Sequence, residues 1–179
     1  IQDAEGLSRI AKSYGAVFHC DAAQAPVAMD LSSFAGRVDL LSLSAHKMYG
    51  PKGIGAIYIA RELHHRIEPL IYGGGQQSGL RSGTTPVSLC VGMGVAAELL
   101  AADDAAERRS ALRRRRDAFA EKLNSLPWPV ATNGPAGHAR HPGNANIRFA
   151  GVAAHDILSA LQPHLAASTG SACTSGIPE

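Results

Sequence analysis

The segment from Val38 to Ile59, VDLLSLSAHKMYGPKGIGAIYI, decides the fold that the sequence predicts. Its first part, Val38 to Leu43, is an apolar run typical of a buried β-strand. A glycine-rich turn, Gly50 to Gly55, follows it, and Ala56 to Ile59 predicts a second strand. The segment therefore reads as two strands joined by a short polar connection.

The polar connection contains a lysine, Lys47, that follows the first predicted strand closely. A lysine held where a buried strand ends can have its ammonium group desolvated, which lowers its pKa and makes the amine nucleophilic. A solvated lysine in a surface turn is the commoner alternative. The residues around Lys47 must decide between these two interpretations.

The residues before this segment repeat the same order of elements. Ile1 to Ser13 has the apolar spacing of a helix, and Gly15 ends it. Ala16 to Cys20 then predicts a buried strand, which stops at the polar residues of Asp21 to Gln24. Two strands that each end in polar residues predict an α/β fold with a mostly parallel sheet and functional groups at the strand ends.

The residues after the segment predict a loop and then helices. Gly73 to Thr84 combines three consecutive glycines with Arg, Ser and Thr, so its backbone could approach an anion or form a flexible surface loop. Thr84 to Pro86 is typical of a helix start, and apolar spacing continues to Pro127 with a break at 101–104. This pattern predicts one long helix or a helix pair that bridges two domains.

The last part of the chain predicts a small α+β region. We expect a strand at Asn146 to Phe149, a helix at Ala154 to Leu161 and a short strand at Leu165 to Ala167. A loop of small residues, Ser168 to Gly176, then surrounds Cys173. Such a loop is typically mobile and exposed, which suits a reactive thiol better than a cysteine of the hydrophobic core.

Composition excludes several classes of protein. The chain has 179 residues, 45% of them hydrophobic, and a net charge of +2, which is too small to indicate nucleic-acid binding. The arginines at 108, 109 and 113–116 predict a solvated helix face, or alternatively a docking patch for an acidic partner. No stretch predicts a membrane span. The three cysteines, Cys20, Cys90 and Cys173, lack zinc-site spacing and predict a reducing, cytoplasmic environment with the first two in the core.

The polar residues at the strand ends match the needs of pyridoxal phosphate. A lysine can bind the cofactor covalently, and a carboxylate can keep the pyridine nitrogen protonated so that the ring accepts electrons. Hydroxyl and imidazole groups suit the phosphate, and an amide suits the ring oxygen. The candidates are Asp21, Gln24, Ser44, His46 and Lys47.

Four motifs carry a resemblance to a known family. They are HCDAAQ (19–24), SAHKMYGPKGIG (44–55), GGGQQSGLRSGT (73–84) and STGSACTSG (168–176). In this order they resemble the cysteine desulfurases, the NifS/IscS-like branch of the fold-type I pyridoxal-phosphate enzymes. The resemblance extends over essentially the whole chain.

The resemblance implies a role for each matched residue. Lys47 would be the Schiff-base lysine and Cys173 the nucleophile, with His46 as a further catalytic residue. Asp21 would pair with the pyridinium nitrogen, Gln24 with the ring hydroxyl, and Ser44 and His46 with the phosphate. Thr84 would reach the phosphate of a neighbouring subunit, which implies a homodimer. The resemblance implies no metal site, except that Cys173 could be a transient iron–sulfur ligand.

The resemblance also implies a reaction and partners. L-cysteine would be converted to L-alanine, and its sulfur would pass as a persulfide on Cys173 to an acceptor such as an iron–sulfur scaffold or thiolation protein. The alternatives are a selenocysteine lyase or another fold-type I enzyme, or a non-catalytic sulfur-relay module. Nucleic acid and membrane are not expected partners.

The same resemblance suggests a C-terminal fragment. Family motifs expected before Ile1 and after Glu179 are absent from the sequence, so we expect this chain alone to be inactive. Residues 1–86 would be the second half of the large cofactor-binding domain. Residues 87–127 would be the bridging helix or helix pair, and 128–179 part of the small domain.

Overall fold

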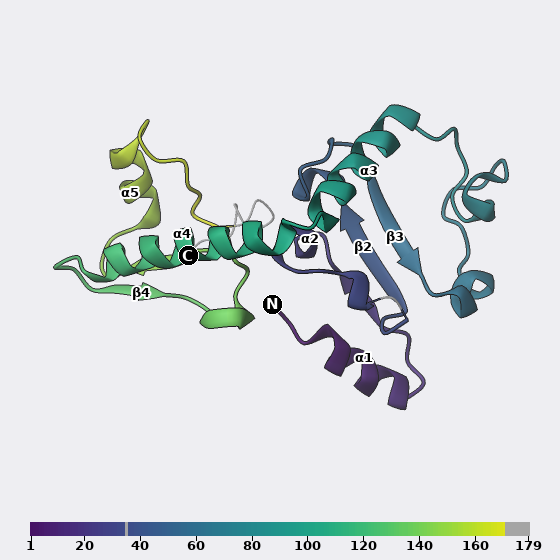
Figure 1. The fold of residues 1–179 in the computed structure, drawn as a ribbon, viewed down its shortest axis with the longest axis horizontal. Coiled ribbons are helices and arrows are strands. Elements are labelled where there is room, and N and C mark those ends of the chain that lie inside the picture. The colour runs from purple at the N-terminus through teal and green to yellow at the C-terminus, as the bar shows by residue number, and fades with distance from the viewer. Residues whose placement is uncertain (35, 171–179) are drawn as a thin grey trace. The chain divides into compact units, whose positions relative to one another are not determined.

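The computed structural model describes residues 1–34 and 36–170, which form two compact units (Figure 1). The first unit comprises Ile1–Ala111 and the second Leu112–Glu179. The boundary falls inside one helix, α4, which spans Ala105–Asn124. Cys173 and its loop neighbours from 171 onward lie outside the described residues.

A three-stranded mixed sheet forms the centre of the first unit. Its strands are β1 (His19–Asp21), β2 (Leu40–Ser44) and β3 (Gly55–Ile59), in the order β1-β2-β3. β1 runs parallel to β2, whereas β3 is antiparallel to β2, so the arrows of β2 and β3 in Figure 1 point in opposite directions. The predicted α/β class is confirmed. The expectation of parallel strands holds for β1 and β2 and fails for β3.

The connection between β2 and β3 explains why that pair is antiparallel. Only a short turn separates the two strands, and a parallel partner would require a crossover of a dozen residues or more. The backbones approach closely at the turn, where the Ala45 amide donates to the Ile54 carbonyl at 3.1 Å. At Gly55 an added Cβ would lie 2.5 Å from the Leu43 carbonyl oxygen, so the position requires glycine.

The core of the first unit lies around the middle strand. Ala22, Val38 and Leu41 are buried together, and partly buried apolar residues pack against them: Phe18, Cys20, Ala25, Leu31, Phe34 and Leu43. These residues come from β1, β2 and the segments that flank them. Their burial fixes the register of the two parallel strands, because a one-residue slip would turn each apolar side chain to the other face.

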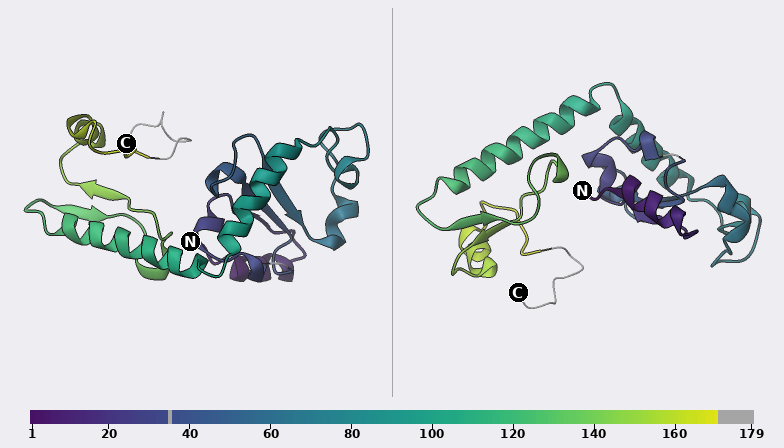
Figure 2. Two further views of the ribbon diagram at one scale, coloured as in Figure 1. Left: turned by 45° about the horizontal axis from the view of Figure 1, so that its top comes forward. Right: turned by 90° about the horizontal axis from the view of Figure 1, so that it is seen from below.

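Three α-helices accompany this sheet. They are α1 (Ala4–Ser13), α2 (Ala25–Ala28) and α3 (Val87–Ala101), with 3₁₀ turns at Ser32–Phe34, Ala45–Lys47, Arg61–Arg66 and Gln76–Gly79. The Asp3 carboxylate caps α1 by accepting from the Gly6 amide at 2.9 Å. Figures 1 and 2 show α1 near the start of β2, where Lys12 forms an ion pair with Asp39 at 3.3 Å.

The second unit is a small α+β structure. It contains the second part of α4, the antiparallel strands β4 (Val130–Thr132) and β5 (Ile147–Phe149), a 3₁₀ turn at Gly137–Ala139 and helix α5 (Ala154–Leu161). The predicted strand and helix here are confirmed. The predicted strand at Leu165–Ala167 is wrong, because the His164 and Leu165 amides donate back to the Leu161 carbonyl and close the end of α5.

The helix predictions before Pro127 hold as well. Pro86 stands directly before α3, and the break at 101–104 separates α3 from α4. The basic run differs from the prediction, because Arg116 is buried rather than solvated. Among the residues that the structure describes, no helix combines the length and apolar character needed to cross a membrane.

Candidate active site

The parallel pair β1 and β2 brings two predicted site residues to one edge of the sheet. Asp21, the last residue of β1, pairs in register with Ser42 of β2, and Ser44 ends β2 at the same edge. The two strands are held there by the Ala22 amide, which donates to the Ser42 carbonyl at 2.9 Å. Polar groups at the carboxyl ends of parallel strands are the usual place for a ligand in α/β proteins.

Ser44 and His46 contact each other directly. A hydrogen bond joins Ser44 Oγ to His46 Nδ1 at 3.0 Å, across the start of the 3₁₀ turn that holds Lys47. Ser44 is half-buried and His46 is exposed. The pair presents a hydroxyl and an imidazole on one side of the turn, which suits recognition of an anion.

Lys47 is exposed, which matches the surface-turn alternative rather than a desolvated ammonium group. The reason lies in the three-residue period of the 3₁₀ turn. Ala45 and Met48, three residues apart, take the buried positions with exposed fractions of 0% and 3%, which leaves His46 and Lys47 facing outward. Lys47 is therefore accessible to a ligand approaching the edge of the sheet.

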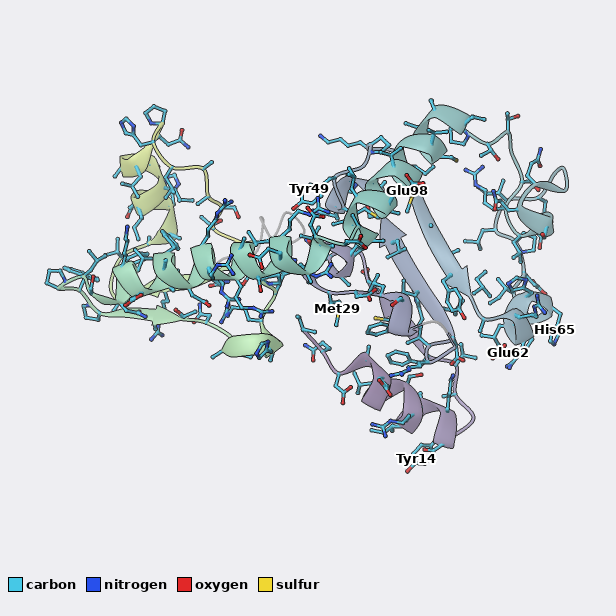
Figure 3. All side chains as sticks on the ribbon, viewed as in Figure 1. Tyr14, Met29, Tyr49, Glu62, His65 and Glu98 are labelled. Atoms are coloured by element: carbon cyan, nitrogen blue, oxygen red, sulfur yellow. The ribbon has the colours of Figure 1, made fainter. Side chains whose placement is uncertain are left out.

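A strained residue lies two positions after this turn. Tyr49 has φ of 67°, in the left-handed region that non-glycine residues rarely adopt, and its ring is largely exposed (Figure 3). The following Gly50 amide donates to the Ala45 carbonyl at 2.8 Å, which closes the turn around Lys47. The backbone turn that carries Lys47 is thus closed by a hydrogen bond.

Helix α3 supports the glycine-rich turn from outside. At Gly92 of α3 an added Cβ would lie 3.1 Å from Pro51, and Leu89 of α3 comes within 3.7 Å of the Cβ position of Gly53. Gly53 itself has φ of 92°. A glycine on each side of this contact permits the close approach, which ties the Lys47 turn to the helix.

Asp21 has one oxygen engaged and one available. Its Oδ1 accepts from the Ala23 amide at 3.0 Å, and its side chain forms no other hydrogen bond or ion pair within the described part of the chain. Gln24 precedes α2 as its N-cap residue, makes no capping bond with its side chain and is exposed. The free carboxylate oxygen and the exposed amide both remain available to a ligand.

Two neighbours of Asp21 were not among the predicted site residues. His19 Nε2 and Ser42 Oγ are joined by a hydrogen bond of 2.6 Å across β1 and β2. The sequence signal for them is the alternation of polar residues in His-Cys-Asp and Ser-Leu-Ser. Residues two apart in a strand share a face, so His19 lies on the face of Asp21 and Ser42 on the face of Ser44. This bond connects the strands that carry Asp21 and Ser44.

The pKa of the Cys20 thiol depends on its burial beside Asp21. Partial burial raises the pKa of Cys20, and the negative charge of the adjacent Asp21 adds to that rise. Cys20 and Cys90 are both free and half-buried, so the expectation of core cysteines is met only in part. At neutral pH the Cys20 thiol is the protonated, unreactive form.

The loop from Gly73 to Thr84 is closed by its own hydrogen bonds. Buried Ser82 donates through Oγ to the Gly74 carbonyl at 2.7 Å, and the Gly83 amide donates to Gln76 Oε1 at 3.2 Å. Gln77 and Ser78 both adopt left-handed conformations. This network contradicts the picture of an unstructured surface loop.

Thr84 is separated from the other candidates. It is exposed and follows the closed loop, and the structure shows no contact between it and Asp21, Ser44 or Lys47 within the described residues. The sheet edge therefore brings together Asp21, Ser44, His46 and Lys47, with Gln24 at the start of α2. Thr84 is not part of that grouping, and Cys173 lies outside the described residues.

The donor set at the sheet edge fits pyridoxal phosphate. An accessible amine, a carboxylate with a free oxygen, an exposed amide and a hydroxyl–imidazole pair supply the groups that the cofactor's aldehyde, ring and phosphate need. The described residues contain no group of three or more His, Cys, Asp or Glu that could hold a metal ion.

Comparison with known proteins places the chain in a family. The model of the class-V aminotransferases matches residues 1–178. The cysteine desulfurase IscS of Colwellia psychrerythraea is 43% identical over 175 residues, which cover 98% of this chain and 42% of that protein. The chain thus spans less than half the length of this relative.

Solved structures agree with this assignment. A NifS-like protein superposes with a TM-score of 0.80 at 32% identity, covering 90% of this chain and 43% of the other. A structure described as SspA in complex with cysteine gives a TM-score of 0.67 at 32% identity, covering 97% of this chain and 46% of the other. The fold is that of the NifS-like fold-type I enzymes, and the chain belongs to the class-V aminotransferase family.

Proposed function

We propose that this chain is part of a pyridoxal-phosphate-dependent cysteine desulfurase. The observation that carries the proposal is the grouping of Asp21, Ser44, His46 and Lys47 at the carboxyl edge of β1 and β2, in a chain similar to IscS. Fold alone would not identify the reaction, because related folds serve many activities. The chemistry of the strand ends adds the specific argument.

Each residue at this edge has a proposed task. Lys47 would hold the cofactor and move a proton at the substrate's Cα, because its amine is accessible and its turn is fixed. The free oxygen of Asp21 would pair with the ring nitrogen, and Gln24 would contact the ring hydroxyl. Ser44 and His46 would hold the phosphate, and Thr84 would hold that of a second subunit in a homodimer. The bound cofactor would supply an acceptor for electrons from the substrate.

Sulfur transfer would use Cys173. Its thiolate would attack the sulfur of L-cysteine, forming an S–S bond while the Cβ–S bond of the substrate breaks. The electrons of the broken bond would remain on the carbon skeleton, which takes up a proton and leaves as alanine. The product is a persulfide on Cys173, which would pass its outer sulfur to an acceptor protein such as an iron–sulfur scaffold in the cytoplasm.

The experiment is an assay of alanine and sulfide release by the whole protein loaded with cofactor. Wild type should release both from L-cysteine with a reductant present, and Cys173→Ser should release neither above background. Cys90→Ser is the matched control, because it removes a thiol that the proposal leaves unused, and it should retain activity. Unchanged turnover in Cys173→Ser would refute the assigned nucleophile.

A second candidate is a selenocysteine lyase that shares the cofactor site. Release of selenium from selenocysteine that survives in Cys173→Ser, with no reaction of L-cysteine, would favour this alternative. A third candidate concerns this chain alone, as a non-catalytic sulfur-relay module. Turnover of L-cysteine with a persulfide on Cys173 in the 179-residue chain would refute that candidate.

A further inference from the structure

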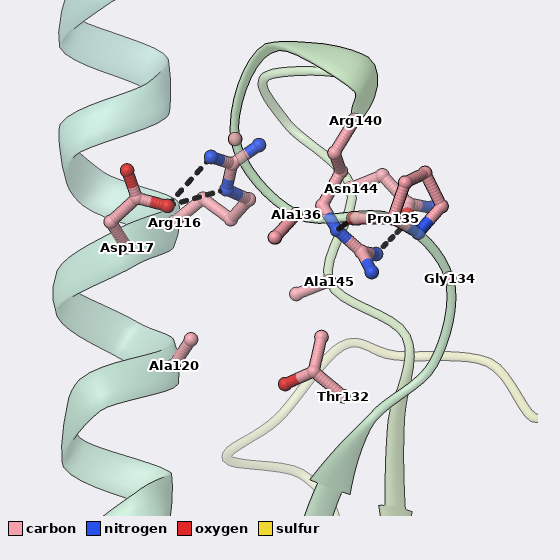
Figure 4. A pocket seen from close by; sticks show the side chains of 11 residues that line it. Arg116, Asp117, Ala120, Thr132, Gly134, Pro135, Ala136, Arg140, Asn144 and Ala145 are labelled. Carbon is pink, nitrogen blue, oxygen red and sulfur yellow. Dashed lines mark hydrogen bonds and ion pairs between the residues drawn. The ribbon is translucent and has the colours of Figure 1, made fainter. Parts of the chain in front are cut away.

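The second unit contains a pocket that the proposed function does not use. Its volume is about 220 Å³, and it lies between α4 and the loop that joins β4 to β5 (Figure 4). Pockets for drug-sized ligands typically measure roughly 300 to 1,000 Å³. This one is therefore suited to a small ligand. Most of its lining residues have small side chains, while two arginines, Arg116 and Arg140, contribute guanidinium groups.

Arg140 is buried without a charged partner. It is 7% exposed, and its Nε donates to the Pro135 carbonyl at 2.8 Å and its Nη1 to Asn144 Oδ1 at 3.1 Å. Its Nη2 donates to the Asn133 carbonyl. All three acceptors are neutral, and in the described part of the chain no carboxylate contacts this guanidinium. Three of its five N–H groups are used, so two remain.

Arg116 reaches the pocket from α4 and is 9% exposed. Its Nε and Nη2 both contact Asp117 Oδ1, at 2.8 and 2.6 Å, and its Nη1 donates to the His141 carbonyl at 3.1 Å. Among the described residues, Asp117 is the only carboxylate that lines the pocket, and it is already paired with Arg116. Two guanidinium groups against one carboxylate leave one positive charge, which belongs to Arg140.

The loop is shaped to approach this charge. Gly134 has φ of 85°, and an added Cβ there would lie 3.3 Å from Nη2 of Arg140. Asn133 is held in turn by Asn146, because its Nδ2 donates to Asn146 Oδ1 at 2.9 Å. Arg140 thus holds the loop together through hydrogen bonds. That role requires its N–H donors but not its positive charge. A buried positive charge without a counter-ion is unfavourable.

We propose that this pocket binds a small oxyanion, a carboxylate or a phosphate, through the free N–H groups of Arg140. A guanidinium group matches the two oxygens of such an anion and binds it through charge-assisted hydrogen bonds. Thr132 lines the pocket with a hydroxyl that has no partner among the described residues, and it offers a further donor. The limited volume favours small anions over nucleotides.

The test is calorimetric titration of the whole protein with sodium phosphate and, separately, with sodium acetate, against sodium chloride of equal ionic strength. The protein is first saturated with pyridoxal phosphate, so that phosphate cannot report on the proposed cofactor site. We expect saturable binding of at least one anion. Arg140→Gln should raise its Kd roughly tenfold or more, and Thr132→Val should raise it roughly two- to tenfold.

The control is Arg115→Gln, which removes the same charge from an exposed position of α4 and should leave the Kd within roughly twofold. Circular dichroism identifies any variant that fails to fold. If Arg140→Gln does not fold, the effect of Thr132→Val on the Kd tests the proposal instead. Absence of saturable binding for both anions would overturn the proposal. So would equal weakening by Arg115→Gln. The readout is binding rather than turnover, so failure here leaves the proposed function untouched.

Discussion

At the scale of single residues, Gly55 shows how one position fixes the turn that presents Lys47. Its missing side chain allows β3 to approach the Leu43 carbonyl of β2, and no other residue fits without a shift of backbone. The same turn buries Ala45 and Met48 and leaves His46 and Lys47 outside. The position of the proposed cofactor lysine therefore depends on Gly55, which is not itself a candidate site residue.

We expect Gly55→Ala to destabilise the protein by roughly 1 to 3 kcal/mol, because the new Cβ would force the two strands apart. Urea unfolding of the whole protein measures the change. Gly94→Ala is the control: Gly94 lies inside α3 with no atom near its Cβ position, so this change should stabilise the protein by roughly 0.5 to 1 kcal/mol. Equal effects of the two substitutions would contradict the account of the turn.

The thiol of Cys20 gives a prediction for pH dependence. Burial and the charge of Asp21 raise its folded-state pKa, so the proton is retained to higher pH in the folded than in the unfolded protein. The raised pKa contributes to the stability of the folded protein below the unfolded-state pKa of Cys20, and this contribution is lost as the pH rises through the folded-state pKa. In cofactor-free protein, alkylation of Cys20 should therefore have a midpoint above that of an ordinary cysteine.

Asp21→Asn should move this alkylation midpoint to lower pH without restoring an ordinary value, because burial is the larger cause and remains. Glu62→Gln, on the 3₁₀ turn Arg61–Arg66 (Figure 3), removes a carboxylate elsewhere and should leave the midpoint unchanged. Mass spectrometry of the Cys20 peptide across a pH series measures both variants. A midpoint that does not respond to Asp21→Asn would refute the proposed charge effect.

Much of the site could be predicted residue by residue, because polar residues after apolar runs mark strand ends. Asp21, Ser44 and His46 follow this rule. The exposure of Lys47 could not be predicted, because it depends on which members of the 3₁₀ turn face the core. The burial of Arg140 could not be predicted either, since it depends on hydrogen bonds to backbone carbonyl groups whose positions the sequence does not reveal.

At the scale of elements, the loop from Gly73 to Thr84 differs most from a simple reading of its composition. Glycine-rich segments are often flexible, yet this one is closed around buried Ser82. The Ser82 amide also donates to the Ile71 carbonyl at 3.3 Å. Gly73, Gly79 and Gly83 have positive φ, which glycine adopts easily. The glycines therefore allow one defined backbone conformation rather than a flexible one.

Ser82→Ala should loosen this loop, because it removes the hydrogen bond to the Gly74 carbonyl, which is worth about 1 kcal/mol. Hydrogen exchange of peptides covering 71–84 should become faster by roughly five- to tenfold where exchange follows local opening. Ser88→Ala, an exposed serine of α3, should leave those peptides unchanged. Unaltered exchange in Ser82→Ala would contradict the closed loop.

Helices were easier to predict than strands at this scale. Pro86 and the polar break at 101–104 define α3 and α4 through local chemistry. The direction of β3 and the absence of a strand at Leu165–Ala167 depend on partners and connections rather than on local pattern. The short strand β4 was not expected, because three residues carry too little pattern to differ from a loop. Its pairing with β5 is what defines it as a strand.

At the scale of the whole molecule, the chain has the NifS-like fold yet leaves a large apolar surface on α3. Val87, Val91, Val95 and Leu99 recur every four residues along this helix and are at least half exposed. A helix with apolar residues on all sides is normally buried. The chain spans 42% of its relative, and the division into a large-domain part, bridging helices and a small-domain part stays a prediction.

We propose that the turn after β2 holds the cofactor through Lys47. The direct measurement is mass spectrometry of the whole protein after incubation with pyridoxal phosphate, borohydride reduction and proteolysis. The account predicts the reduced cofactor on the peptide that contains Lys47, its loss in Lys47→Ala, and its retention in Lys52→Ala, which removes an exposed lysine of the same segment. Labelling that survives in Lys47→Ala, or that falls on Lys52 instead, would contradict the account.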